Sequence, residues 1–191
     1  MKNAFSYVSI LLLPVAMLLP VWVLKSLATY KGFELAYRFR QKIGGYYIGA
    51  SARFANKPLF PHGYTGIYIS GGATLGENCV IFQQVTIGSD SLADSKKAGS
   101  PTIGNNCYIG AGAKIIGNIV VGDNCRIGAN AVVYKDVPDN CTVVAGGGMR
   151  ILKHSDPLDN HFYNYGPHGR QFWDGKQFVP VSDHSGAAFD G

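Results

Sequence analysis

The sequence has 191 residues, a formal net charge of +5, and 25 glycines with only 15% charged residues. This length allows one ordinary domain with extra segments at its ends. So many glycines without a proline-rich bias indicate tight turns rather than disorder. Residues 25–57 hold seven basic side chains and one acidic one, directly after an apolar segment. A basic stripe in that position favours an anionic membrane surface over nucleic acid as the binding partner.

Residues 4–24 carry no charge. A helix of this length reaches ~30 Å, about the thickness of the hydrocarbon core of a bilayer. The basic residues that follow place the rest of the chain on the cytoplasmic face of a bacterial plasma membrane. Pro14 and Pro20 interrupt the run, so a full span and a shallow insertion both stay open. A cleaved signal peptide is the competing interpretation, although the apolar run is long for one.

Residues 26–42 mix apolar and basic side chains, which predicts an amphipathic helix at the membrane interface. Gly44 and Gly45 end this helix. We therefore predict a membrane-associated helical segment over residues 1–45.

An aliphatic residue recurs every six positions through the middle of the chain. Neither the 3.6-residue period of a helix nor the alternation of an ordinary strand explains this spacing. Six residues can form one short strand and one corner, and three such units close a triangular coil with a stacked aliphatic interior. The sequence therefore predicts an all-β solenoid over residues 46–153. The repeating positions are Ile69, Leu75, Ile81, Ile87, Ile103, Ile109, Ile115, Val121, Ile127 and Val133.

The repeat is interrupted once, between Ile87 and Ile103, by ten extra residues. The polar stretch 89–101 is therefore predicted to leave the coil as a loop. A role in substrate contact and a role in subunit contact are equally compatible with this loop.

The four cysteines show no spacing typical of a zinc site, and we predict buried free thiols that pack like small apolar residues. Such thiols fit a reducing cytosol, and no metal is expected. The cysteines are Cys79, Cys107, Cys125 and Cys141.

Residues 154–191 form a tail that is rich in aromatic side chains, and we predict it to be irregular apart from one hairpin. Asp174 and Gly175 lie between two apolar runs and predict the turn of that hairpin. We favour a strap that packs on the coil or on a neighbouring subunit. The alternative is a surface that binds carbohydrate or membrane.

Two stretches carry a family resemblance: ENCVIFQQVTIG (residues 77–88) and PTIGNNCYIGAGAKIIGNIVVGDNCRIGANAVVYKDVPDN (residues 101–140). They resemble the serine O-acetyltransferase branch of the left-handed β-helix acyltransferases. They are still more similar to the short relatives that O-acetylate capsule, lipopolysaccharide or other glycans. The resemblance covers about residues 61–153. It implies a left-handed parallel β-helix, a homotrimer, and acetyl-CoA bound in a groove between neighbouring subunits.

The resemblance also implies a catalytic histidine in a motif like HATG, which HGYTG (residues 62–66) matches with one inserted residue. An alcohol stays protonated at neutral pH, whereas an imidazole titrates at about pH 6.5 and can accept the hydroxyl proton. We therefore predict that His62 is the general base, the alternative being a structural histidine at a coil corner. A zinc-dependent carbonic anhydrase on this fold would need three coil histidines, and His62 is the only histidine before the tail.

Three departures separate this chain from the serine enzymes of the family. Pro61 stands where those enzymes have an aspartate that orients the histidine, and Ser100 precedes Pro101 where they have a second histidine. The sequence also shows no counterpart of their large helical N-terminal domain. A backbone carbonyl or another side chain would then have to orient His62. Gln83 and Gln84 are predicted to lie near His62 and to bind substrate hydroxyls, unless they are a structural corner pair.

For acetyl-CoA, the resemblance implies backbone contacts at Gly110 and Ala111 and, one 18-residue turn later, at Ala129. Small residues are needed there because the pantetheine arm lies directly against the backbone. By position, the cations that meet the phosphates are Lys135, Arg150 and Lys153.

The expected function is a membrane-associated O-acetyltransferase that moves acetyl from acetyl-CoA to a sugar hydroxyl of a polysaccharide or lipid-linked glycan. The alternatives are a serine O-acetyltransferase of cysteine biosynthesis and a trimeric scaffold without activity. N-acetylation of an amino sugar also stays open.

Overall fold

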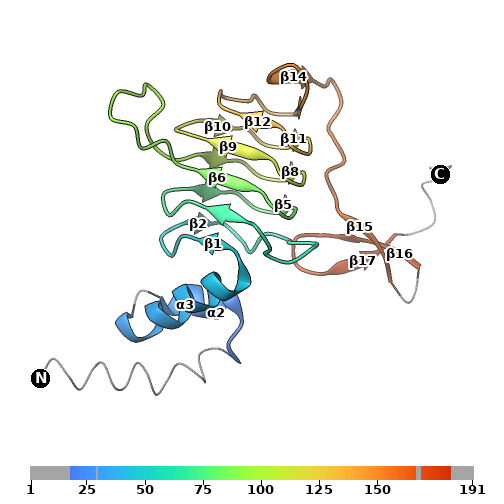
Figure 1. The fold of residues 1–191 in the computed structure, drawn as a ribbon. Coiled ribbons are helices and arrows are strands. Elements are labelled where there is room, and N and C mark those ends of the chain that lie inside the picture. The colour runs from blue at the N-terminus through green and yellow to red at the C-terminus, as the bar shows by residue number, and fades with distance from the viewer. Residues whose placement is uncertain (1–17, 29, 167–168, 182–191) are drawn as a thin grey trace, which may run out of the picture.

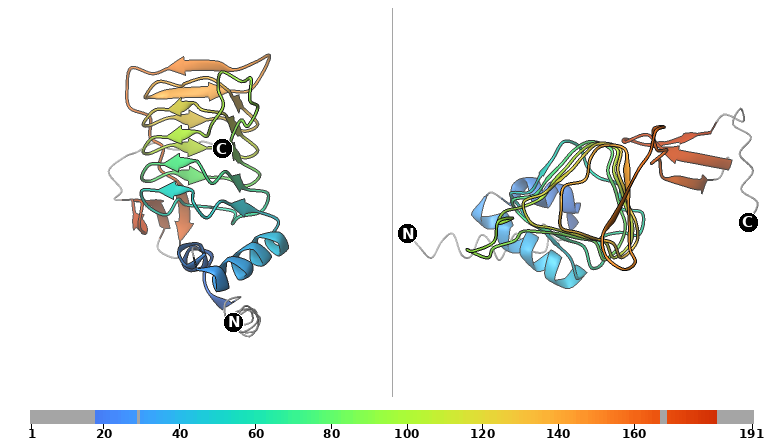
Figure 2. Two further views of the ribbon diagram at one scale, coloured as in Figure 1. Left: turned by 90° about the vertical axis from the view of Figure 1, so that its left-hand side faces the viewer. Right: turned by 90° about the horizontal axis from the view of Figure 1, so that it is seen from above.

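The computed structural model describes residues 18–28, 30–166 and 169–181, which form a short helical base, a coil of β-strands and a small separate sheet (Figure 1). Seen along its axis, the coil is triangular (Figure 2). Strands that stack in neighbouring turns are parallel, apart from the last one.

Three sheets form the faces of the coil. The first face contains β1 (Tyr47–Ile48), β3 (Tyr68–Ile69), β6 (Thr86–Gly88), β9 (Lys114–Ile116) and β12 (Val132–Val133). The second face contains β2 (Arg53–Phe54), β4 (Thr74–Leu75), β7 (Thr102–Ile103) and β10 (Val120–Val121). The third face contains β5 (Val80–Ile81), β8 (Tyr108–Ile109), β11 (Arg126–Ile127), β13 (Cys141–Val144) and β14 (Arg150–Lys153).

The six-residue repeat supplies the interior of the coil. Ile69 pairs with Ile87, and Ile87 pairs with Ile115, so the aliphatic positions stack in register and are fully buried. Burial of one such side chain stabilises the fold by about 1.5–3 kcal/mol. The strand pairing confirms the predicted β-solenoid and is consistent with the left-handed β-helix acyltransferase fold. The four cysteines are buried and free, as predicted.

Asparagines build the corner between the second and third faces. Asn78, Asn106, Asn124 and Asn140 all have φ between 53° and 57°, a left-handed conformation that asparagine tolerates better than most residues. Their amides also bond between turns: Asn78 donates to Asn106 at 3.2 Å, and the amides of Asn124 and Asn140 lie 3.0 Å apart. We call this edge the asparagine corner.

The N-terminal residues close one end of the coil. In α2 (Val21–Leu27), Val21 and Leu24 are buried, and the Trp22 ring packs edge-on against Phe54 at 4.9 Å. In α3 (Lys31–Gly44), the Tyr37 hydroxyl donates to the carbonyl of Ile48 at 2.7 Å. These apolar side chains therefore bury against the coil.

The expected membrane localisation is wrong. Over the described part of the chain, no helix has both the length and the apolar character required to cross a bilayer. The single amphipathic helix predicted over residues 26–42 is instead broken before Lys31, and Val21, Leu24 and Ala28 are buried in the protein. Residues 4–17 of the predicted apolar segment lie outside the described residues.

Residues 89–101 project from the coil between β6 and β7 (Figure 1). Asp90 and Gly99 exchange backbone hydrogen bonds at the base of this loop, at 2.9 and 2.8 Å. The Lys97 ammonium lies 3.3 Å from the carboxylate of Asp136, which fixes the loop to a later turn of the coil.

The tail runs along the asparagine corner and ends in an antiparallel sheet beside the coil (Figure 2). Buried Asn160 donates to the carbonyls of Asn106 and Cys125. The predicted hairpin is present, with Asp174 and Gly175 in its turn, and the described part of the tail is more regular than predicted because this hairpin belongs to a sheet of three strands. These are β15 (Tyr163–Gly166), β16 (Gly169–Trp173) and β17 (Phe178–Pro180).

Candidate active site

The corner between the third and first faces carries the predicted catalytic histidine, and we call it the histidine corner. Backbone bonds stack its turns: Gln84 N–H donates to Thr65, Gly112 to Gln83, and Asn130 to Ala111, at 3.1, 3.0 and 2.8 Å. The corner therefore aligns the segment of His62 with residues 83–84, 111–112 and 129–130 along one edge of the coil.

His62 is exposed, and two neighbours fix its ring. Its Nδ1 lies 2.7 Å from the Oε1 of Gln83, and the ring packs edge-to-face with Phe82 at 5.4 Å. A carboxamide oxygen only accepts hydrogen bonds, so Nδ1 carries the proton and the lone pair of Nε2 is free. That nitrogen can accept a proton from an incoming hydroxyl.

The two glutamines therefore differ. The side-chain oxygen of Gln83 is engaged by His62, whereas Gln84 is exposed and adopts a left-handed conformation with φ 61°. The carbonyl of Gln84 accepts a hydrogen bond from the ammonium of Lys114 at 2.6 Å. Sequence reasoning missed Phe82, which follows β5, and Lys114, the first residue of β9, because the six-residue repeat does not indicate what an outward-facing side chain contacts.

Small residues line the histidine corner beyond Gln83. Ala111 is half-buried and Ala129 is exposed. A Cβ atom on Gly110 would lie 2.7 Å from the amide nitrogen of Ala129, so the stacking of turns itself requires this glycine. Within the described residues, the amides of Ala111 and Ala129 donate no backbone hydrogen bond. We call Gly110, Ala111 and Ala129 the small-residue strip. Its main-chain N–H groups can therefore bind an extended ligand.

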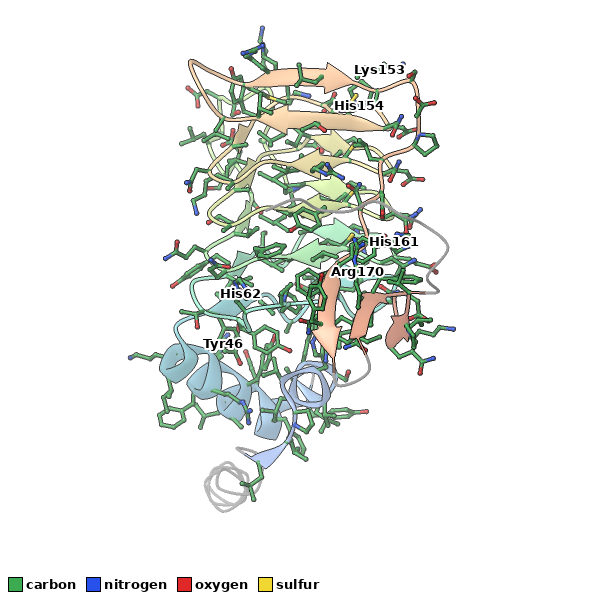
Figure 3. The ribbon with its side chains drawn as sticks, turned by 90° about the vertical axis from the view of Figure 1, so that its right-hand side faces the viewer. Tyr46, His62, Lys153, His154, His161 and Arg170 are labelled. Atoms are coloured by element: carbon green, nitrogen blue, oxygen red, sulfur yellow. The ribbon has the colours of Figure 1, made fainter. Side chains whose placement is uncertain are left out.

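Only one of the three predicted cations lies on this edge within a single chain. Arg150 pairs with Val144, next to the open glycine turn at residues 146–148, so it lies at the end of the histidine corner. Lys153 pairs with Cys141 at the other end of the strand, and Figure 3 shows it on the opposite side of the third face from His62. Lys135 lies on another corner, beside Tyr134.

The position of the second histidine in the serine enzymes holds a hydroxyl cluster instead. Ser100 Oγ lies 2.6 Å from Ser89 Oγ, and Ser89 also bonds Ser70. This cluster lies at the base of the loop, on a different corner from His62. In the described part of the chain, no three histidine, cysteine or acidic side chains are grouped closely enough to hold a metal ion.

A cavity of about 470 Å³ lies between the His62 segment and the tail sheet. Gly63 and Tyr64 line it from the segment, and Trp173 lines it from β16. Lys57 and Lys176 add two ammonium groups to the rim. The tail therefore forms one wall of a cavity whose other wall includes Gly63, the residue after His62, although His62 itself does not line it.

Known proteins share this coil. A family described as bacterial transferase hexapeptide (six repeats) matches residues 100–135. The match covers the coil from β7 to β12. The serine acetyltransferase of Synechococcus elongatus is 42% identical over 119 residues, which cover 61% of this chain and 48% of that relative.

Solved structures of serine acetyltransferases match this chain as well. Serine acetyltransferase of Neisseria gonorrhoeae matches with a TM-score of 0.61 at 31% identity, over 72% of this chain and 52% of that one. The Brucella abortus enzyme in complex with coenzyme A matches with a TM-score of 0.61 at 32% identity, over 72% and 55%. The chain spans about half the length of the curated relatives it matches.

These relatives correct the expected acceptor. The sequence favoured a sugar hydroxyl of a glycan, but the matching proteins and structures are serine acetyltransferases. The expectation of a polysaccharide O-acetyltransferase is therefore wrong, and the glycan partner finds no support. The differences at Pro61 and Ser100 favoured an acceptor other than serine, and the matching proteins do not support that prediction.

Proposed function

We propose that this protein transfers an acetyl group from acetyl-CoA to the hydroxyl of serine, with His62 as the general base. The observation that carries the proposal is the Nδ1 contact of His62 with Gln83 at 2.7 Å, which leaves Nε2 free. The small-residue strip in line with this histidine and the similarity to serine acetyltransferases support it.

The reaction would proceed by direct transfer. Nε2 of His62 takes the hydroxyl proton while the oxygen forms a bond to the thioester carbonyl carbon. The tetrahedral intermediate then breaks its carbon–sulfur bond, and the thiolate of coenzyme A takes the proton back from His62. The products are the O-acetyl ester and free coenzyme A, so the proton and the acetyl group are both balanced.

The co-substrate would lie along the histidine corner. The thioester would be beside His62, the pantetheine arm against Ala111 and Ala129, and the phosphates near Arg150. In a homotrimer a neighbouring subunit would form the other wall of this groove, and Lys135 and Lys153 would reach the phosphates only from that subunit. Lys57 and Lys176 offer positive charge for the carboxylate of an amino acid.

An assay with purified protein, acetyl-CoA and serine tests this proposal. We expect coenzyme A release that depends on serine, with O-acetylserine identified by mass spectrometry. A tyrosine in place of Ala129 would fill the strip at an exposed position, so the KM for acetyl-CoA should rise by about tenfold or more. Ala55→Tyr is the matched control, because Ala55 is also an exposed alanine but lies in the first turn of the coil. Turnover that is independent of serine, or an unchanged KM in the Ala129→Tyr variant, contradicts the proposal.

A further inference from the structure

We infer that Gln83 is the positioning residue of His62, and that it holds the imidazole with its proton on Nδ1. The inference rests on the proposed role of His62 as a base. Pro61 leaves no carboxylate in the position from which the serine enzymes orient their histidine, and the 2.7 Å contact with Gln83 supplies a neutral acceptor instead.

The backbone fixes Gln83 where this contact requires it. Its carbonyl accepts the N–H of Gly112, and the N–H of the next residue, Gln84, donates to Thr65, so residues 83–84 are tied to the turns on both sides. Phe82 packs on the His62 ring and in turn on Phe162 of the tail at 6.0 Å. The imidazole is therefore held at one nitrogen and at one edge by two consecutive residues of the same corner.

The contact matters because neutral imidazole has two tautomers. An unrestrained ring in water favours the proton on Nε2, and that form cannot take a hydroxyl proton with the same nitrogen. An acceptor at Nδ1 reverses this preference. A carboxylate would do the same but would also stabilise the charged imidazolium, whereas an amide selects the tautomer without adding charge.

Within the described residues, no carboxylate forms an ion pair with His62. The other ionisable groups on elements at this corner are Lys114, whose ammonium bonds the Gln84 carbonyl, the hydroxyls of Tyr64 and Tyr108, and Arg150 at the end of the corner. Burial raises the pKa of both tyrosines, so they stay neutral in the range where a histidine titrates. These tyrosines therefore do not account for a shift of the acid limb of the activity profile when Gln83 is changed.

Three variants test the inference. Gln83→Leu removes the acceptor, and we expect kcat to fall by about tenfold or more while the KM for acetyl-CoA changes little. Gln83→Glu keeps an acceptor but adds charge, so turnover should return and the acid limb of the kcat profile should move up by about one pH unit. Gln177→Glu is the matched control, because it makes the same change at an exposed tail position and should move nothing.

The tautomer of His62 can also be measured directly, without turnover, by NMR. In protein labelled with ¹⁵N-histidine, the His62 signals are those that the His62→Asn variant lacks. We expect the ring proton on Nδ1 in the parent protein and on Nε2 in Gln83→Leu. The same spectra and a melting curve show whether each variant is folded.

A His62 proton on Nε2 in the parent protein would overturn the inference, because Gln83 would then donate rather than accept. An unshifted acid limb in a folded Gln83→Glu variant would overturn it as well. If His62→Asn keeps full turnover, the proposed function itself fails. If His62→Asn is inactive while every Gln83 variant behaves like the parent protein, only the positioning role fails.

Discussion

Single residues at the corners of the coil have little freedom, because neighbouring turns touch through their main chains. Gly110 lies between Ile109 of the interior and Ala111 of the strip. An added Cβ there would lie 2.7 Å from the amide nitrogen of Ala129 and 2.9 Å from the carbonyl of Ile127. Both atoms belong to the backbone of the next turn and cannot rotate away.

Gly110→Ala should therefore destabilise the coil by about 1–3 kcal/mol, as overpacking does in other cores. A melting curve measures the effect. Gly71→Ala is the matched control: its added Cβ would meet the Ser51 hydroxyl at 2.6 Å, and that flexible side chain can turn aside. Equal melting temperatures for the two variants would mean that the turns can separate more easily than this packing allows.

Elements that leave the coil are held by few polar contacts. The loop at residues 89–101 is tied to the later turn through Asp136, which accepts hydrogen bonds from Val120 N–H at 3.0 Å and Lys97 Nζ at 3.3 Å. The Val120 N–H, with help from Lys97, holds the pKa of Asp136 below its ordinary value. A carboxyl with a lowered pKa in the folded state stabilises that state above its unfolded pKa, and the gain disappears as pH falls through the folded pKa.

Asp136→Asn should therefore lower the melting temperature at pH 7, where the parent carboxylate is charged. The difference between parent and variant should shrink as pH falls through the lowered pKa of Asp136 and vanish only below it, where both side chains are neutral. Because Asp136 is exposed, the effect at pH 7 is small and should weaken with added salt. Asp94→Asn in the exposed loop is the control. A difference that persists unchanged at acid pH would show that the Asp136 charge does not hold the loop.

At the scale of the whole molecule, local and long-range features differ in what the sequence could predict. The six-residue spacing of Ile69 and its equivalents sufficed for the coil, because each hexad is a local unit and the stack repeats it. The contact between His62 and Gln83 could not be predicted in the same way. Tyr47 pairs with Tyr68, 21 residues later, whereas Tyr68 pairs with Thr86 after 18. The turn that contains His62 is therefore longer than the repeat, and the repeat does not predict which residues its ring contacts.

The positions of the N-terminal helices and of the tail could not be predicted from composition or periodicity. Val21 and Leu24 are as apolar as a membrane segment, because burial against protein and burial in lipid select the same side chains. Composition alone therefore suggested lipid where the structure has a coil end. The course of the tail depends on Asn160 reaching Asn106 and Cys125, which are more than thirty residues away in the sequence, so periodicity carried no signal for it.

The chain as a whole then combines a rigid coil with one reactive edge, and the central claim is that catalysis occurs on that edge. The most direct measurement is the rate of coenzyme A release by His62→Ala, with acetyl-CoA affinity measured on the same sample. We predict a loss of about 10²–10⁴-fold in kcat with affinity retained. His62 is exposed and packs edge-to-face on a single aromatic ring, so the variant should stay folded. Turnover at the parent rate in a folded His62→Ala protein would contradict the account.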